Sequence, residues 1–178
     1  MEIILAENHG FCYGVKRAVE MANEAADSDG KSYTLGPIIH NPQVVGRLES
    51  KGVSPIQEVS DIDEGTMIIR SHGVGPAIYE EAEEKGLNIL DATCPHVKKA
   101  QQDAKSVIED GMTLVILGEK NHPEVKSINL WANNKGIIIE NEESAKNLRI
   151  VEKMGVVVQT TFSQFKFNSI IEILEKKS

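Results

Sequence analysis

The feature that most constrains the fold is an internal repeat with a spacing of 82 residues. The segment C-Y-G-V-K-R-A begins at Cys12, and the similar segment C-P-H-V-K-K-A begins at Cys94. At the same spacing, L-G-P-I-I-H ends at His40 and L-G-E-K-N-H ends at His122. Self-similarity at a fixed offset indicates a duplicated structural unit. The chain is therefore expected to contain two similarly folded domains.

Short β-branched runs alternate with longer helix-like segments along the whole chain. The expected strands are 3–6, 32–35, 52–56, 66–70, 88–91, 113–117, 136–140 and 156–159. The expected helices are 14–27, 42–50, 76–85, 97–109, 123–132, 142–148 and 163–176. Apolar strands that alternate with helices predict an α/β fold, in which helices flank a mainly parallel sheet. Each of the two small domains is expected to be built in this way.

The two expected domains span residues 1–93 and 94–178, and the strand pattern hints at a third. The strand at 88–91 leads into the second repeated cysteine segment, whereas the strand at 3–6 leads into the first with no helix before it. We therefore expect strand 3–6 to belong to a third unit whose body is absent from these residues. The expected architecture is pseudo-threefold, with three such domains closed in a ring.

Composition excludes several classes of protein. The 178 residues carry 27 acidic and 19 basic side chains, a net charge of −8, whereas nucleic-acid binders usually present a basic face. Apolar runs such as T-L-V-I-L at 113–117 are far shorter than the roughly 20 residues that span a bilayer. The start, M-E-I-I-L-A-E-N-H, lacks the basic and long apolar regions of a signal peptide. A cytoplasmic location with neither nucleic-acid nor membrane partners is expected.

Cys12 and Cys94 are the only cysteines of the chain, and each is expected between a strand and a helix. A helix N-terminus stabilises a thiolate, the form that metals bind. Three thiolates would suit an iron–sulfur cluster, but two do not distinguish such a cluster from zinc. The alternative is that both cysteines are buried as small hydrophobic residues. The basic pairs Lys16–Arg17 and Lys98–Lys99 are expected to be solvated.

Three histidines, His40, His72 and His122, each follow an expected strand and precede a helix that begins with proline. Ligands of parallel α/β sheets bind at the edge formed by the carboxyl ends of the strands. Imidazoles together with the N–H groups of helix N-termini would suit a phosphate or diphosphate. Taken singly, each histidine is more often a loop-capping or solvated residue, but three at equivalent strand ends reverse that preference and favour a binding site.

Two further residues could take part in chemistry at this edge. Glu124 stands in the first turn of an expected helix, where it could stabilise the helix dipole or deliver protons. Thr160 lies in Q-T-T-F-S at 159–163, a segment that could simply cap the last helix. If Thr161 or Ser163 is the cap, Thr160 is free to contact the hydroxyl of a ligand.

The motifs, taken together, resemble those of the 4-hydroxy-3-methylbut-2-enyl diphosphate reductase (IspH/LytB) family. In order they read G-F-C-Y-G-V, H-N-P-Q-V-V, R-S-H-G-V, D-A-T-C-P-H-V, H-P-E-V and Q-T-T-F-S. The resemblance covers nearly the whole chain. It implies three similar α/β domains around a central four-iron, four-sulfur (4Fe–4S) cluster. That architecture agrees with the repeat found in the sequence itself.

The resemblance implies a role for each candidate residue. Cys12 and Cys94 would be two of three cluster thiolates. His40 and His72 would bind the substrate's diphosphate, with His122 beside them. The cluster would act as Lewis acid and source of electrons, which a ferredoxin- or flavodoxin-like donor provides.

The catalytic acid of the family would be Glu124, which relays protons so that the substrate hydroxyl leaves as water. Thr160 would orient either Glu124 or that hydroxyl. The products would be the two isoprenoid diphosphate isomers, isopentenyl and dimethylallyl diphosphate, made in the last step of the methylerythritol phosphate pathway.

The sequence departs from the family pattern because two of the family's site motifs are not found in it. The family's third cluster cysteine and its Ser-x-Asn diphosphate contact lie in a third domain, and neither is found in these 178 residues. The chain alone is therefore expected to be inactive and to hold no stable cluster. Two alternatives remain: a zinc-dependent enzyme that uses both cysteines and a histidine, and a non-catalytic diphosphate-binding module.

Overall fold

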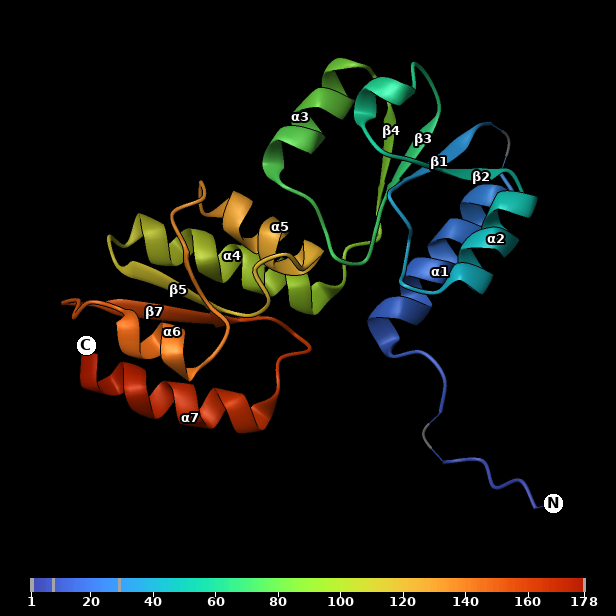
Figure 1. Cartoon of the computed structure of the whole chain (residues 1–178). Coiled ribbons are helices and arrows are strands. Elements are labelled where there is room, and N and C mark those ends of the chain that lie inside the picture. The colour runs from blue at the N-terminus through green and yellow to red at the C-terminus, as the bar shows by residue number, and fades with distance from the viewer. Residues whose placement is uncertain (1, 8, 29, 178) are drawn as a thin grey trace.

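The computed structural model describes residues 2–7, 9–28 and 30–177, which fold around two separate parallel sheets. The first sheet has the order β2-β1-β3-β4. Its strands are β1 (Ser32–Leu35), β2 (Val53–Ile56), β3 (Thr66–Ile69) and β4 (Asn88–Asp91). The surrounding helices are α1 (Tyr13–Ala26), α2 (Pro42–Ser50), the short 3-10 helix η1 (Val59–Asp61) and α3 (Pro76–Glu84). Figure 1 shows α1 and α2 on one side of this sheet and α3 on the other.

The second sheet has the order β6-β5-β7 and is also parallel throughout. Its strands are β5 (Thr113–Leu117), β6 (Ile137–Ile139) and β7 (Met154–Val158). Its helices are α4 (Pro95–Glu109), α5 (Pro123–Trp131), α6 (Glu142–Asn147), α7 (Gln164–Leu174) and the 3-10 helix η2 (Glu175–Lys177). The predicted α/β class, with parallel sheets flanked by helices, is confirmed.

The sheets repeat one topology, as the 82-residue spacing predicted. The order β2-β1-β3 corresponds to β6-β5-β7, with the first strand of each unit in the middle. The fourth strand, β4, has no counterpart in the second sheet. We retain residues 1–93 and 94–178 as the proposed division into domains, and the third unit stays a prediction.

Both faces of each sheet are buried, which explains why the strands are almost continuously apolar. In β3, Ile68 packs into the cluster with α1 and α2, while Met67 and Ile69 pack into the cluster with α3. In β5, Ile116 packs toward α4 and α5, while Leu117 packs toward α6 and α7. Side chains of a strand alternate between faces, so a strand covered on both sides buries both sets of side chains and is mostly apolar; the buried Ser32 and Thr34 of β1 are exceptions.

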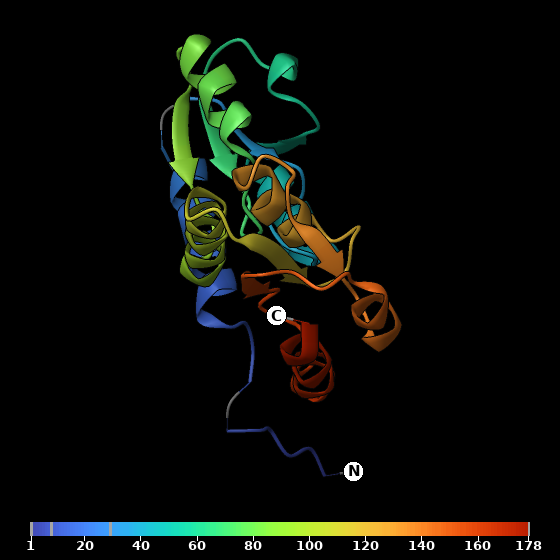
Figure 2. The same cartoon turned by 90° about the vertical axis from the view of Figure 1, so that its left-hand side faces the viewer.

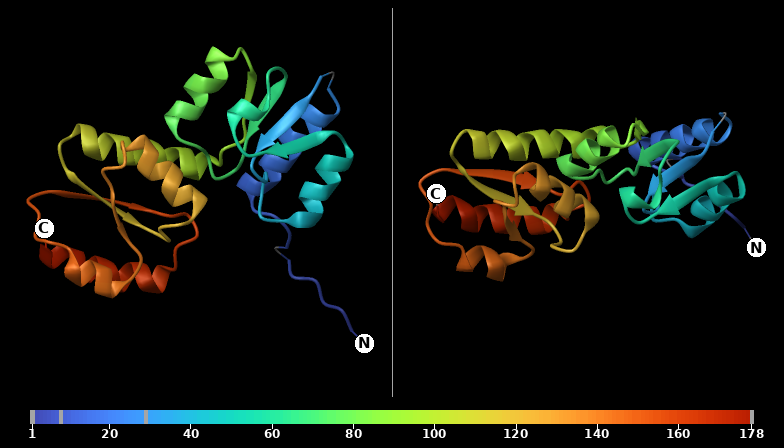
Figure 3. Two further views of the ribbon diagram at one scale, coloured as in Figure 1. Left: turned by 45° about the horizontal axis from the view of Figure 1, so that its top comes forward. Right: turned by 90° about the horizontal axis from the view of Figure 1, so that it is seen from above.

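The two units touch through the segment that follows β3. The carbonyl oxygen of Val74 accepts hydrogen bonds from Trp131 Nε1 at 2.9 Å and from Ser127 Oγ at 3.3 Å. Ser127 also accepts a bond from Gln101 Nε2, 2.5 Å away. The right-hand view of Figure 3 shows the result: the long helix α4 points toward α1, so that the second unit abuts the first.

The strand predicted at 3–6 is wrong for this structure. Residues 2–7 form no regular element, and Ile3, Ile4 and Leu5 are 74%, 83% and 75% exposed. A strand needs the free edge of a neighbouring strand to pair with, and no pairing of this segment occurs within the described residues. Figures 1 and 2 show the segment extending away from the rest of the molecule. Its assignment to a third unit remains a prediction.

No helix among residues 2–7, 9–28 and 30–177 has the length and apolar character needed to cross a membrane.

Because residues 2–7 are exposed and the core is fully buried, changes in the two places should affect stability very differently. Removal of residues 2–7 should change the free energy of unfolding by less than about 0.5 kcal/mol, as for surface changes generally. Ile68→Ala, at a position that is 0% exposed, should lower it by about 2–5 kcal/mol. Urea unfolding followed by circular dichroism measures both. A truncated chain as unstable as Ile68→Ala would show that the segment packs on the body.

Candidate functional site

Three loops at the carboxyl ends of strands build the site. His40 lies between β1 and α2, and His72 lies between β3 and α3 in the first unit. His122 is the N-cap residue of α5, after β5 of the second unit. This edge of a parallel sheet is where the connecting loops and the N-termini of the following helices gather. The same edge of both units therefore supplies the histidines.

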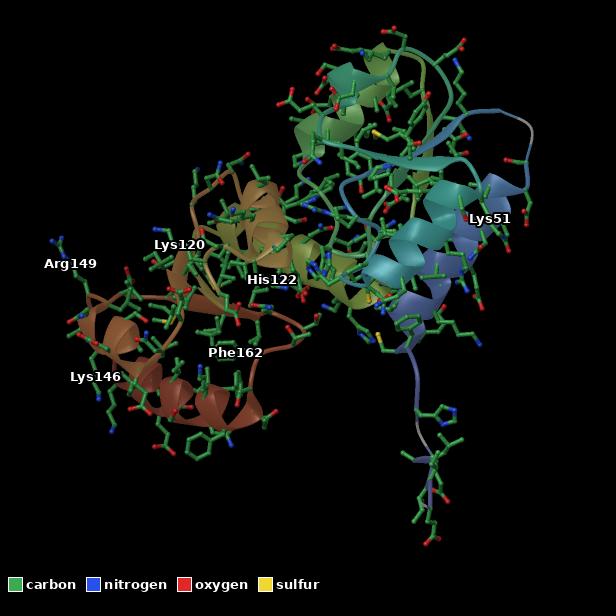
Figure 4. The ribbon with its side chains drawn as sticks, turned by 45° about the vertical axis from the view of Figure 1, so that its right-hand side comes forward. Lys51, Lys120, His122, Lys146, Arg149 and Phe162 are labelled. Carbon is green, nitrogen blue, oxygen red and sulfur yellow. The ribbon has the colours of Figure 1, made fainter. Side chains whose placement is uncertain are left out.

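The structure brings the three predicted histidines together. The ring centroid of His72 lies 4.6 Å from that of His40 and 5.3 Å from that of His122. The His40 and His122 rings are 6.1 Å apart, and ligating atoms of all three residues lie within 4.8 Å of one another. His40 is exposed and the other two are half-buried. In Figure 4, His122 lies near the centre of the molecule, toward the first unit.

Backbone hydrogen bonds link these loops to the second cysteine. The N–H of Ser71 donates to the carbonyl of Ile38 at 3.3 Å, which ties the His72 loop to the His40 loop. The N–H of Cys94 donates to the carbonyl of Ser71 at 2.9 Å. The residue before His72 thus holds the cysteine on one side and the His40 loop on the other.

Burial and neighbouring charge keep His72 neutral. Loss of solvent, followed by the effects of His40, His122 and Arg70, lowers the pKa of His72 from 6.5 to about 4. Its Nδ1 is buried and has no hydrogen-bond partner among the described residues. His122 is fixed differently, because its Nδ1 accepts the N–H of Glu124 at 3.1 Å. A neutral His122 then carries its proton on Nε2, where it can donate to a ligand.

Glu124 and Thr160 form a pair across the second unit. Glu124 is 2% exposed, and its two carboxylate oxygens accept hydrogen bonds from Thr160 N at 2.6 Å and Thr160 Oγ1 at 2.8 Å. Sequence reasoning missed the neighbouring residue, Gln159, which is buried and accepts the N–H of Glu119 at 2.9 Å. The sequence did offer a signal for this residue, because a polar glutamine directly follows the apolar strand that ends at Val158. The loop after β7 is therefore built to hold a buried carboxylate.

Each cysteine caps a helix without using its sulfur for the cap. Cys12 is the N-cap of α1 and Cys94 is the N-cap of α4, and both are free thiols. No acidic side chain occupies the first turn of either helix. The partial positive charge of a helix N-terminus lowers the free energy of a thiolate, so both sulfurs are suited to bind a metal.

A glycine brings the two cysteine-bearing helices into contact. A Cβ placed on Gly14 in α1 would lie only 2.5 Å from the sulfur of Cys94. The sulfur therefore rests against the backbone two residues after Cys12, in space that any side chain would fill. Of the ligands that iron–sulfur clusters use, cysteine thiolates are the commonest. Two free thiols at adjoining helix N-termini fit such a group.

Arg17 also holds α1 against the start of α4. The expectation that the basic pair Lys16–Arg17 is solvated is therefore wrong for Arg17. Arg17 is half-buried and donates to the carbonyls of Thr93 at 3.2 Å and Asp91 at 3.3 Å. Lys98 is also only partly exposed, and its Nζ lies 2.6 Å from Asp91 Oδ2. Arg17 reaches from the helix of one cysteine to the backbone just before the other. The exposed lysines, Lys16 and Lys99, agree with the expectation.

Comparison with known proteins assigns a family to this arrangement. The family described as LytB protein matches residues 3–178. The 4-hydroxy-3-methylbut-2-enyl diphosphate reductase of Geotalea uraniireducens is 49% identical over 172 residues, which cover 97% of this chain and 61% of the relative. The relative of the same name from Geobacter metallireducens is 49% identical over 178 residues, covering 99% of this chain and 63% of the relative. The chain thus spans less than two thirds of these relatives.

Solved structures show the same fold. The structure of the E-1-hydroxy-2-methyl-but-2-enyl-4-diphosphate reductase from Plasmodium falciparum superposes with a TM-score of 0.90 at 32% identity, over 96% of this chain and 55% of that one. A second structure is described as (E)-4-hydroxy-3-methyl-but-2-enyl diphosphate reductase, the terminal enzyme of the non-mevalonate pathway. It superposes with a TM-score of 0.81 at 45% identity, over 97% of this chain and 63% of that one.

The environment of His72 leads to a pH prediction. We expect its imidazole to titrate at about pH 4, and NMR of the histidine C2 protons, assigned with His72→Gln, measures this. Because the folded-state pKa lies below the unfolded value of 6.5, the unfolded chain binds the proton more readily between these pH values. This residue's contribution to stability is complete above about pH 6.5 and declines as the pH falls toward 4. A midpoint near 6.5 would contradict the buried, charge-lined environment.

Proposed function

The chain belongs to the LytB protein family, and from this membership we propose that its residues bind and reduce 4-hydroxy-3-methylbut-2-enyl diphosphate. One observation supports the proposal most strongly. Three clustered histidines, a buried carboxylate and the free thiol of Cys94 lie at the carboxyl ends of strands in two adjoining units, and the helix that carries the second free thiol, Cys12, packs against Cys94. These groups provide, in one region, the means to hold a metal group, an anion and a proton.

The histidine cluster is the proposed diphosphate site. The Nε2–H of a neutral His122 and the imidazoles of His40 and His72 can donate to phosphate oxygens. The N-terminus of α2, which begins at Pro42 beside His40, adds a partial positive charge. Because His72 is neutral before the ligand arrives, the ligand's negative charge would favour its protonated form and strengthen its hydrogen bond.

Glu124 is the proposed proton donor to the leaving oxygen. Removal of the substrate hydroxyl as water needs two electrons and one proton on the departing oxygen, and a second proton on carbon completes the product. A buried and positioned carboxyl group can deliver the proton on oxygen as a general acid. Thr160 holds both oxygens of Glu124 through its N–H and hydroxyl, so it is the proposed positioning residue.

Cys12 and Cys94 are the proposed ligands of the cofactor. When bound, a 4Fe–4S cluster would supply Lewis acidity and two electrons, which come from a ferredoxin- or flavodoxin-like donor. Gly14 and Arg17 hold the helix that carries Cys12 against Cys94 and the backbone just before it. The 178 residues contain two cysteines, so the third thiolate implied by the family is proposed to come from the remaining part of a complete reductase. A cytoplasmic location is proposed because reduced cysteines are usual there.

A second candidate function rests on the histidines themselves. Ligating atoms of His40, His72 and His122 lie within 4.8 Å of one another, and histidine is a common ligand of zinc. A neutral His72 can bind a metal without first losing a proton. A zinc-binding protein would use this cluster in place of the diphosphate. The diphosphate assignment is favoured because the buried Glu124 and the two thiols then also have roles.

The reductase proposal is tested in a chimera. These 178 residues replace the matching part of the Geobacter metallireducens relative, which contributes the rest of the protein. After anaerobic reconstitution with iron and sulfide, the chimera should reduce 4-hydroxy-3-methylbut-2-enyl diphosphate with a chemical electron donor. Glu124→Gln should lower the rate by roughly 100-fold or more, within the range for loss of a general acid. Glu119→Gln, at an exposed position in the same loop, is the matched control and should keep full activity.

The remaining outcomes separate the two candidates. A folded chimera that takes up iron yet reduces no substrate would overturn the reductase proposal. One equivalent of zinc per chain that survives dialysis, and that His122→Ala abolishes, would establish the zinc alternative. Full reductase activity in Glu124→Gln would leave the reductase assignment intact but remove the proposed role of Glu124.

A further inference from the structure

A second cavity lies beside the histidine cluster and shares none of its proposed site residues. It has a volume of about 360 Å³ and is formed by both units. The first unit contributes Gly36, Arg70 and the segment Gly73–Gly75, and the second contributes Asn121 and Lys126. A cavity of this size is large enough for a small organic molecule.

Arg70 is the feature of this cavity that the proposed function does not use. Its side chain is half-buried, its Nε is fully buried, and that atom has no hydrogen-bond partner among the described residues. Neither a carboxylate within ion-pair distance nor any other acceptor for its guanidinium occurs in the described part of the chain. Burying a charged group without a partner is costly. A guanidinium held in this way is suited to receive the oxygens of an anionic ligand.

The backbone is shaped to place Arg70 there. Gly36 has a φ of +70°, and a Cβ at this residue would lie 2.8 Å from Arg70 Nη1. Gly75 has an ordinary backbone conformation but is sterically restricted, because a Cβ there would lie 2.8 Å from side-chain atoms of Leu130, which also lines the cavity. Side chains at either position would fill the space that the guanidinium or the cavity wall now occupies. The cavity is therefore a built feature of the fold.

The charged side chains that line the cavity, Arg70 and Lys126, are both cationic. Lys126 is exposed, comes from α5 of the second unit, and has no ion-pair partner within the described residues. Among the residues that the structure describes, no aspartate or glutamate lines the cavity, although the whole chain carries a net charge of −8. The remaining walls combine the amides Gln57 and Asn121 with apolar side chains such as Ile78. Two unpaired cations with apolar walls between them are complementary to an anion that has a short hydrocarbon part.

We propose that this cavity is a second binding site, for a small organic anion whose phosphate or carboxylate lies against Arg70 and Lys126. The apolar part of the ligand would contact Val74, Ile78 and Leu130. Because Arg70 belongs to the first unit and Lys126 to the second, the bound anion bridges the two units. The site is distinct from the proposed reductase site, since none of its lining residues is proposed there as a cofactor ligand, a proton donor or a substrate contact.

The test is a titration of the 178-residue chain with butyl phosphate, followed by amide NMR. The amide shifts of Val74 and Lys126 report the cavity, and that of His40 reports the histidine cluster. We expect the cavity reporters to saturate with a dissociation constant on the order of 1 mM. Arg70→Gln and Lys126→Ala should each weaken this binding by at least about fivefold, while His40→Ala should affect only the cluster.

A matched variant and a second probe complete the design. Arg149→Gln removes an exposed cation from the side of the second unit that faces away from the first, labelled in Figure 4, and should leave the cavity titration unchanged. Pentanoate in place of butyl phosphate tells whether the cavity prefers carboxylate or phosphate. Cavity reporters that do not saturate with either probe would overturn the proposal. So would binding that survives in Lys126→Ala, an exposed substitution that leaves folding intact, or binding that Arg149→Gln weakens equally.

Discussion

The contact between the N-termini of α1 and α4 is the constraint on which the rest of the site depends. The sulfur of Cys94 lies against Gly14, where no side chain fits, and Arg17 bonds to the carbonyls just before Cys94. These interactions join the first repeated unit to the start of the second at the repeated cysteine motif. The position of one cysteine is thereby set by the helix that carries the other.

The same contact places the histidines. The N–H of Cys94 donates to the carbonyl of Ser71, whose own N–H donates to the carbonyl of Ile38 in the His40 loop, so backbone hydrogen bonds connect the cysteine to both imidazole loops. His122, which matches His40 in the sequence repeat, joins them from the second unit; it caps α5 itself, whereas His40 precedes Asn41, the N-cap of α2. Duplication of a parallel α/β unit therefore does more than enlarge the protein. It brings together the carboxyl-end edges of two sheets. The first unit contributes His40 and His72, and the second contributes His122 and the buried Glu124.

Much of this arrangement could be predicted from the sequence because it follows from periodicity. The strands of both sheets, the helices beginning at prolines and the equivalence of Cys12 with Cys94 are local or repeated patterns. The segment at 3–6 was predicted as a strand because its composition is that of a strand, yet pairing depends on an edge that no local pattern reveals. Arg17 and Arg70 were missed for the same reason, since their surroundings come from residues distant in sequence.

The central claim is that Cys12 and Cys94 converge on one metal site, and cobalt(II) titration of the reduced chain tests it most directly. Thiolate-to-cobalt charge transfer gives an absorption band that histidine ligands alone do not produce. The account predicts a band that saturates at one cobalt per chain and binding that weakens by at least about tenfold in Cys12→Ser and in Cys94→Ser. Gly14→Ala, which pushes the sulfur of Cys94 away, should weaken it as well. A titration unchanged in either serine variant would show that the two sulfurs do not share a metal.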